Sequence, residues 1–223
     1  MALTLADQIR RFRVLAKDAI EPYRAKTVDV VDSLNDAQVQ GCIRGRLLVA
    51  DGDPALCEIA MVGGQQVYPL HPALYELIHL RITSAGDKPR TVVLKSREWL
   101  DRERPGWRDC DVPAEIAIQD DTSLRMVGAV KNGETLRIEA YRLPLAPMEL
   151  DTDEPEIHGA HHEHLIQWAL HKAFSIPDSQ LFDPERAALS ERAFTRYFGP
   201  LPDSDLRRIT REDVVHHNEA VLP

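Results

Sequence analysis

Four stretches of the chain carry apolar residues at every third or fourth position, the spacing that places them on one face of a helix. In the first stretch Leu5, Ile9 and Phe12 share such a face, and Thr4 stands with Asp7 in the arrangement of a capping box. The predicted helices cover residues 3–20, 28–48, 157–175 and 184–198. The pattern therefore predicts two helices before a long central segment and two helices after it.

The central segment, residues 55–141, consists of short extended runs separated by turn-forming residues. The Gly-Gly pair at 63–64 and the Asn-Gly pair at 132–133 are predicted to form tight hairpin turns, because both tolerate positive φ angles. Residues 72–78 and 96–102 are predicted to form short helices between strands. The predicted strands cover residues 56–62, 65–68, 80–83, 91–94, 114–118, 124–130 and 136–141.

This order of elements predicts an α+β fold. Helices from both ends of the chain are expected to form a helical bundle beneath an antiparallel β-rich insertion, within a single domain that spans residues 1–198. Residues 199–223 lack a buried face and are predicted to be an extended polar tail that becomes ordered on a partner, with simple disorder as the alternative. The charged residues of this tail are Asp203, Asp205, Arg207, Arg208, Arg211, Glu212 and Asp213.

Composition narrows the classes of function. Of the 223 residues, 43% are hydrophobic and 28% are charged, as in an ordinary folded protein, and 36 acidic against 27 basic residues give a net charge of −9. This acidic balance argues against tight sequence-specific binding of duplex DNA, because neutralising phosphates calls for a basic surface. No run reaches the roughly 18 apolar residues of a membrane helix, so no membrane partner is expected. The first residues also lack the apolar stretch of a signal peptide.

Cysteine usage and motif searches give no sign of a catalytic site. The three cysteines are odd in number and form no C-x-x-C pair, so neither a disulfide framework nor a zinc ribbon is predicted, and a reducing cytoplasm fits them. Cys42 and Cys57 lie in helical and apolar runs and are expected to be buried structural thiols. The chain has no G-x-S-x-G elbow, no Walker loop and no G-x-G-x-x-G after a strand. We therefore expect a protein that is not an enzyme and needs no cofactor.

Histidines gather near the start of the third predicted helix. They are His158, His161, His162, His164 and His171, and pairs of them at helical spacing could present imidazoles to a metal. The pattern is not H-E-x-x-H, and a catalytic zinc site would need a further ligand from elsewhere. Hydrogen-bonded helix-start residues are the favoured interpretation, so no metal site is predicted. Adventitious metal binding and a metal-dependent hydrolase remain the alternatives.

Tryptophan and arginine gather in one segment of the β-rich insertion. These residue types anchor protein interfaces more often than others do, which makes the segment a candidate interface loop. Packing of the loop onto its own sheet is an equally open alternative. The candidate residues are Trp99, Arg102, Arg104, Trp107 and Arg108.

The order and spacing of several segments between residues 3 and 198 resemble the head-to-tail adaptor proteins of tailed phages. The segments are residues 3–7 and 32–38 in the first two helices, 65–72 followed by 80–82, and 141–144, 155–158 and 165–170. Residues 23–28 depart from the family, which often has a tryptophan or serine start to its second helix. That difference concerns the cap of this helix.

The resemblance implies a structural virion protein at the head-to-tail interface, assembled in the host cytoplasm. Neighbouring copies would form a dodecameric ring bound beneath the portal protein, with the tail from residue 199 onward reaching into the portal. The ring would extend the DNA channel, through which DNA passes without sequence-specific binding, and would offer a platform to a tail tube or nozzle protein. Another tail component, such as a tail-completion or tube protein, is the alternative.

Overall fold

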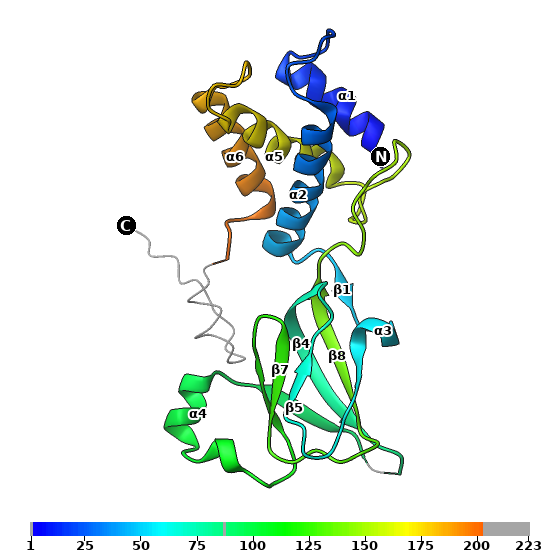
Figure 1. Ribbon diagram of the computed structural model, residues 1–223, viewed down its shortest axis with the longest axis vertical. Coiled ribbons are helices and arrows are strands. Elements are labelled where there is room, and N and C mark those ends of the chain that lie inside the picture. Colours follow the sequence, from blue (N-terminus) through cyan, green and yellow to red (C-terminus); the bar gives the residue numbers. More distant parts are fainter. Residues whose placement is uncertain (1, 87, 203–223) are drawn as a thin grey trace, which may run out of the picture. The chain divides into compact units, whose positions relative to one another are not determined.

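The computed structural model describes residues 2–86 and 88–202, and these residues form two compact units. Residues 2–49 and 142–201 make up a unit of helices, which we call the helical unit. Residues 50–141, together with Pro202, make up a unit built on a sheet, which we call the β unit (Figure 1). The chain combines helices with a sheet, so the predicted α+β class is confirmed.

Polar caps mark the starts of two helices in the helical unit. The Thr4 hydroxyl caps the first helix by accepting a hydrogen bond from the backbone N–H of Asp7, as the sequence predicted. The Asp183 carboxylate caps the last helix through the N–H of Arg186, and Pro184 occupies its first turn. The helices of this unit are α1 (Leu5–Ala16), α2 (Thr27–Gly45), α5 (His162–Ser175) and α6 (Pro184–Phe198).

Three of these helices are shorter than predicted. Helix α1 ends at Ala16 and not at residue 20, because Lys17 adopts a left-handed conformation with a φ of 59°. Helix α2 ends at Gly45 and not at residue 48, because Arg46 does the same with a φ of 50°. Helix α5 begins at His162 and not at residue 157, because residues 158–161 form a turn in which the N–H of His161 bonds the carbonyl of His158.

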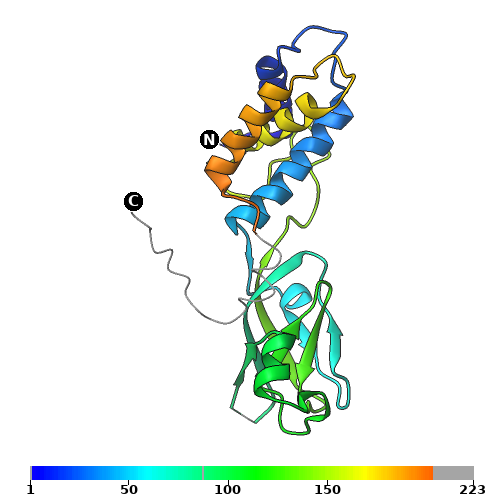
Figure 2. The same ribbon diagram turned by 90° about the vertical axis from the view of Figure 1, so that its left-hand side faces the viewer.

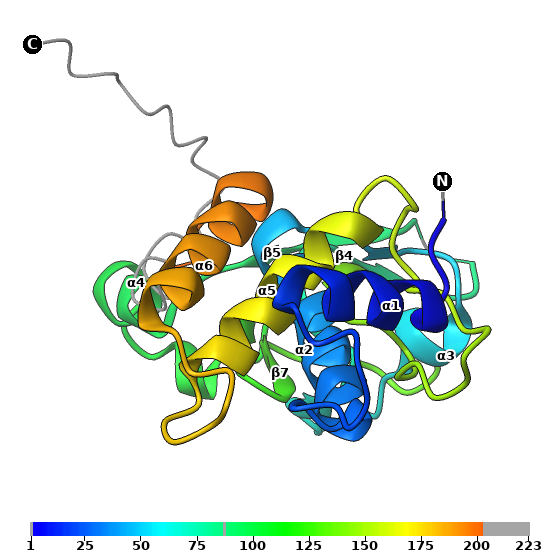
Figure 3. The same ribbon diagram turned by 90° about the horizontal axis from the view of Figure 1, so that it is seen from above.

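Helix α5 is central to the packing of the helical unit. Seen from above, it lies between α6 on one side and α1 with α2 on the other (Figure 3). Ile166 of α5 is buried with Phe12 of α1 and Leu34 of α2, whereas Leu165 is buried with Phe194 of α6. Burying a large apolar side chain stabilises a fold by about 1.5–3 kcal/mol. One helix with two apolar faces therefore joins segments from both halves of the sequence.

A buried ion pair holds the connection between α1 and α2. The Arg13 guanidinium donates to the Asp18 carboxylate at 2.6 Å and to the carbonyl of Ala25 at 2.6 Å. The same carboxylate accepts the backbone N–H groups of Arg24 and Ala25 at 2.8 and 3.1 Å. The connection therefore has a defined shape although it contains no helix. Figure 2 shows it at the same end of the helical unit as the α5–α6 connection.

The β unit contains a sheet whose strands do not follow chain order. The hydrogen-bonded order is β1-β8-β4-β5-β6-β7-β3, and β2 also pairs with β8. Its core gathers apolar side chains such as Tyr68, Leu80, Met126 and Leu136. The strands are β1 (Val49–Ala50), β2 (Glu58–Ala60), β3 (Val67–Pro69), β4 (Leu74–Thr83), β5 (Arg90–Leu94), β6 (Ile116–Gln119), β7 (Ser123–Val127) and β8 (Thr135–Arg142). Short helices α3 (Pro54–Cys57), α4 (Arg97–Glu103) and the 3₁₀ turn η1 (Trp107–Asp109) connect some of them.

Two predictions about the insertion are wrong. The sheet is not wholly antiparallel, because β5 and β6 run parallel, and the chain between them crosses over through α4 and η1. Residues 72–78 are not a helix, since β4 covers most of them. The amide of Gln119 accepts from the N–H of Leu77 and donates to the carbonyl of Tyr75. Leu74 and Leu77 are both buried although they lie three residues apart in this strand, and this spacing of buried residues resembles that of a helix.

The two predicted turns exist but do not make hairpins. Gly64 and Gly133 have φ angles of 81° and 84°, as such turns require. However, β2 pairs with β8 and β3 with β7, so the strands on either side of residues 63–64 are not paired with each other. The strands on either side of residues 132–133, β7 and β8, are not neighbours either. The turns instead bind each other, because the Asn132 side chain accepts the N–H of Gly63 at 2.7 Å.

Two further features stabilise the β unit locally. The buried Glu134 carboxylate receives two hydrogen bonds from the Arg90 guanidinium, at 2.8 and 3.0 Å, and one from the N–H of Lys131. Gly128 has a φ of 108°, and a Cβ at this position would lie 2.4 Å from the carbonyl oxygen of Val112. Only glycine therefore fits position 128 without moving the backbone.

Candidate functional site

Trp107 of the candidate interface loop is packed against its own unit. Its side chain is 5% exposed and lies in a cluster with Leu100 of α4 and with residues of β6 and β7. The indole N–H donates to the Asp101 carboxylate at 2.8 Å. A buried ring whose N–H is hydrogen-bonded stabilises the loop. For Trp107 the structure therefore favours packing onto its own sheet over contact with a partner.

The other residues of the loop form its outer surface. The Arg108 guanidinium lies 4.3 Å from the centre of the Trp107 ring and donates twice to Asp101, at 2.6 and 3.3 Å. This guanidinium and the Trp107 N–H lower the pKa of the exposed Asp101 carboxyl. Arg102 is paired with the neighbouring Glu103. Trp99 is half-buried on α4, and the exposed Arg104 forms no ion pair among the described residues. The loop is thus held by hydrogen bonds to Asp101 and presents guanidinium groups.

A cleft of about 200 Å³ lies beside Trp107. Arg104 and Pro105 form part of its rim, and Val112, which is 57% exposed, lines it together with Val127 of β7. The cleft has room for a single apolar side chain of a partner. Aromatic rings with adjacent arginines and a small apolar cleft are typical of the energetically dominant parts of protein interfaces.

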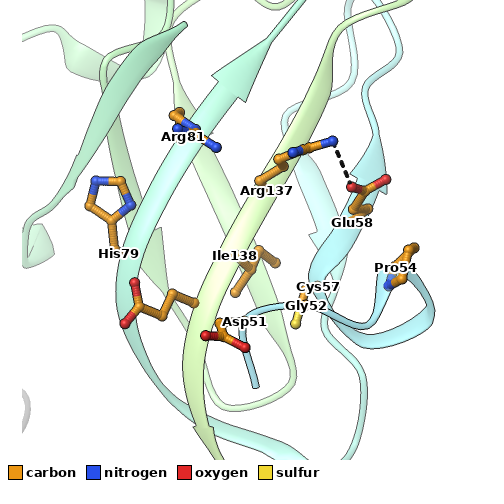
Figure 4. A pocket seen from close by; sticks show the side chains of 10 residues that line it. Asp51, Gly52, Pro54, Cys57, Glu58, His79, Arg81, Arg137 and Ile138 are labelled. Carbon is orange, nitrogen blue, oxygen red and sulfur yellow. Dashed lines mark ion pairs between the residues drawn. The ribbon is translucent and has the colours of Figure 1, made fainter. Parts of the chain in front are cut away.

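A larger polar groove, with a volume of about 610 Å³, lies over strands β4 and β8 of the β unit (Figure 4). Arg137 of β8 forms an ion pair with Glu58 of β2 at 3.1 Å. Arg81 and His79 project from one face of β4, because residues two apart in a strand share a face. Asp51 lies toward the other end of the groove in the same view. Charges of both signs suit a polar segment of a partner protein better than an apolar ligand.

The histidines serve the packing of α5. The buried His162 ring accepts the N–H of Leu3 at 3.0 Å through Nδ1, and its Nε2 lies 2.8 Å from the carbonyl of Ile157. His164 stacks on Tyr197 of α6 with ring centres 3.4 Å apart, and His161 lies 3.1 Å from the hydroxyl of the same tyrosine. Burial, followed by the neighbouring histidines, lowers the pKa of His161.

These contacts match the favoured interpretation of hydrogen-bonded histidines. His171 also takes part, since its Nδ1 lies 3.1 Å from the carbonyl of Ala187. Within residues 2–86 and 88–202, no group of three or more histidine, cysteine or acidic side chains is arranged to hold a metal ion.

The two thiols predicted to be buried are buried. Burial raises the pKa of Cys42 to about 12, with a further contribution from Glu156. Burial also raises the pKa of Cys57. Both thiols are therefore protonated and unreactive at neutral pH.

A comparison with protein families assigns the chain to one of them. A family profile described as SU10 adaptor protein matches residues 3–216. The chain belongs to this family. The match covers nearly the whole chain, so the adaptor family predicted from the sequence is confirmed. Among curated proteins, no match is found.

Membership of the adaptor family indicates where the protein is found. A phage adaptor is a structural component of the virion. None of the helices in the described part of the chain has the length and apolarity needed to span a membrane. The predicted docking residues of the tail, which run from Asp203 to Asp213, lie outside the described residues but inside the matched segment.

Sequence reasoning found the loop but missed the polar groove. His79 and Arg81 on β4, and Arg137 and Glu139 on β8, are separated by two positions, the spacing of outward-facing residues in a strand. This signal was present in the sequence. It was obscured because the start of β4 has the spacing of a helix, and because nothing in the sequence indicated that β4 and β8 are neighbours.

Proposed function

We propose that this adaptor binds beneath the portal protein of a tailed phage, extends the DNA channel, and provides the platform on which a tail tube or nozzle protein docks. Neighbouring copies form a dodecameric ring in the neck of the virion, after assembly in the host cytoplasm. The protein acts through its surfaces and catalyses no reaction. Its buried cysteines and hydrogen-bonded histidines are consistent with this role, because they serve packing.

The observation that carries this proposal is the extent of the family match. The match begins at residue 3 and continues to residue 216, so it includes both units and most of the residues beyond them. Asp203, Arg207, Arg211 and Asp213 therefore belong to the part of the chain that the family shares. We assign this segment, with its charges of both signs, to the portal. A segment that orders on binding loses affinity through its entropy, and repetition around a ring offsets that loss.

The β unit supplies the second group of contacts. The loop with Arg104 and Trp99, and the cleft beside Trp107, face a neighbouring protein in the assembled neck. This assignment is supported by the hydrogen bonds within the loop, in which Asp101 accepts from both Trp107 and Arg108. A preorganised loop loses little conformational entropy on binding.

The net charge of −9 fits a channel through which DNA passes. An acidic wall repels phosphate groups at short range, which keeps DNA from adhering to the channel. We therefore expect no sequence-specific contact with DNA.

Light scattering after size exclusion tests the proposal, first on the adaptor alone and then on its mixture with the portal of the same phage. We expect a species with the mass of the portal plus a ring of adaptors. Removing residues 203–223 should abolish this species, whereas removing residues 217–223, which lie outside the family match, should leave it intact.

Either of two results would contradict the proposal. If a competent portal shows no change in mass with the full chain, another tail component becomes the better assignment. If the chain without residues 203–223 binds the portal as well as the full chain does, the tail is not the docking segment.

A further inference from the structure

Exposed apolar side chains gather at one end of the helical unit. At the end of α1 and in the α1–α2 connection they are Val14, Leu15, Ile20, Tyr23 and Val28, which we call the first half. Near the α5–α6 connection they are Ile176, Phe182 and Leu189, which we call the second half. Both connections lie at the same end of this unit in Figures 1 and 2. We call the two halves together the loop-end surface.

The two halves adjoin each other. The Arg186 guanidinium, in the first turn of α6, donates to the carbonyl of Leu15 at 2.7 Å. The same guanidinium lies 4.0 Å from the centre of the Phe174 ring. Beneath the surface, Ala16 and Val30 share a buried cluster with Leu181 and Ala187. The loop-end surface is therefore a fixed part of the fold.

The loop-end surface is too large to be incidental. Its eight apolar residues are between 41% and 84% exposed. At roughly 150–200 Å² of accessible surface for a large side chain, they expose about 700 Å² together. The largest apolar patch of a typical monomer is about 300–600 Å², and a stable interface buries about 800 Å² on each partner. When the first half of one copy binds the second half of another, the two faces together supply about 700 Å² of exposed apolar surface, somewhat less than half of the roughly 1,600 Å² that a standard interface buries in total, and the surrounding polar residues would contribute the rest.

The charges around the two halves have opposite signs. Around the first half the exposed cations are Lys17, Arg24 and Lys26, and the exposed acids are Glu21 and Asp29, so cations outnumber acids by one. The nearby Asp18 is buried against Arg13.

Between residues 176 and 189, Asp178, Asp183 and Glu185 outnumber one cation, Arg186, whose guanidinium is already bound to Leu15; the exposed Lys172 and Arg192 lie just outside this range. The first half is therefore apolar with a basic rim, and the second half is apolar with an acidic rim.

We propose that the loop-end surface is the contact between copies of this chain, in which the first half of one copy binds the second half of the next. The inference rests on the proposed function, because it names the surface through which adaptor copies meet. Unlike halves attract each other through their rims, while like halves repel, so the charges select one pairing. The two faces of the contact differ in sequence, as a heterologous contact requires. Because the two halves adjoin, growth beyond a dimer is the result that distinguishes a contact repeated around a ring from a two-fold pair.

Sedimentation velocity on the full chain alone, from about 10 µM to about 1 mM, tests the proposal. The wild type should increase in mass with concentration. Ile20→Glu disables the first half and Leu189→Glu disables the second, and each should weaken association by about tenfold or more. Both residues are more than half exposed, so neither change should unfold the chain. Val62→Glu, which alters an exposed apolar residue of the β unit that lies in neither the loop nor the cleft, is the matched control and should associate as the wild type does.

Mixing the two disabled variants gives the sharpest outcome. Each variant keeps the half that the other has lost, so an equimolar mixture should form a one-to-one dimer more strongly than either variant associates alone. Lys26→Glu mixed with Glu185→Lys should likewise associate more strongly than either does alone, and added salt should reduce the difference.

Three results would overturn the proposal: a wild type that stays monomeric throughout, single variants that associate normally, or a mixture that remains monomeric. Portal binding is measured separately by light scattering. Self-association without portal binding would remove the proposed function and leave the contact between copies in place. If the chain binds the portal but its loop-end variants associate as the wild type does, the proposed function stands and the proposed contact between copies is wrong.

Discussion

Replacing Asp18 with asparagine should destabilise the helical unit. The Asp18 side chain is 1% exposed and that of Arg13 is 6% exposed, so the ion pair between them is shielded from water. An asparagine here would keep the shape of the side chain, but it would remove the charge and place an N–H₂ group among N–H donors. Removing one partner of a buried ion pair costs about 3–5 kcal/mol, and we expect about 3 kcal/mol for this isosteric change.

Urea and thermal unfolding followed by circular dichroism at a helix-sensitive wavelength measure the effect. A loss of about 3 kcal/mol corresponds to a fall of about 10–20 °C in Tm for a unit of roughly 100 residues. The control is Asp32→Asn, because Asp32 lies exposed on α2 and should change stability by less than about 0.5 kcal/mol. Exchange of backbone amides between residues 18 and 26 should also accelerate in the Asp18 variant and not in the control.

The same substitution should alter the response to acid. Burial raises the pKa of Asp18, but the N–H groups of Arg24 and Ala25 and the Arg13 guanidinium outweigh it, so the pKa lies below the ordinary value of 3.8. A carboxyl group with a lowered pKa contributes its stability above the unfolded value, and that contribution is lost as the pH falls through the folded pKa. The wild type should therefore lose more stability than Asp18→Asn below about pH 4. Equal stabilities of the Asp18 and Asp32 variants at pH 7 would refute the reasoning.

Three further predictions concern other parts of the chain. Glu134→Gln should destabilise the β unit by about 3 kcal/mol in urea unfolding, because it removes the charge of the buried carboxylate that is paired with Arg90. The control Glu115→Gln, at an exposed position, should have little effect, and similar losses of stability in the two variants would refute this prediction. Gly128→Ala should cost more in Tm than Gly86→Ala, since both have positive φ but only the first brings a Cβ against backbone; equal shifts would contradict it. When one equivalent of zinc is added and the protein is then dialysed, wild type and His161→Gln should both retain less than about 0.1 zinc per chain by elemental analysis. If the wild type instead keeps stoichiometric zinc and the variant loses it, a metal-dependent hydrolase becomes the better interpretation.

Local patterns in the sequence were sufficient to identify most elements and the family. The helical spacing of apolar residues located α1, α2, α5 and α6, and Thr4 marked the start of α1. The turn residues at 63–64 and 132–133 were identified from chemistry that acts within two or three residues. The order of motifs indicated the adaptor family, which the match over residues 3–216 confirmed. These features depend on interactions between residues close in sequence, so they can be read along the chain.

Only the tertiary structure decided which strands are neighbours and which residues remain exposed. The pairing of β2 with β8, and the parallel pairing of β5 with β6, depend on contacts between residues far apart in sequence. Trp107 could be assigned to its own core only once β6 and β7 were placed beneath it. The loop-end surface was invisible for the same reason, because its halves belong to connections near opposite ends of the chain that meet through Arg186 and Leu15. Burial and strand pairing are properties of the whole fold, and local sequence patterns therefore cannot specify them.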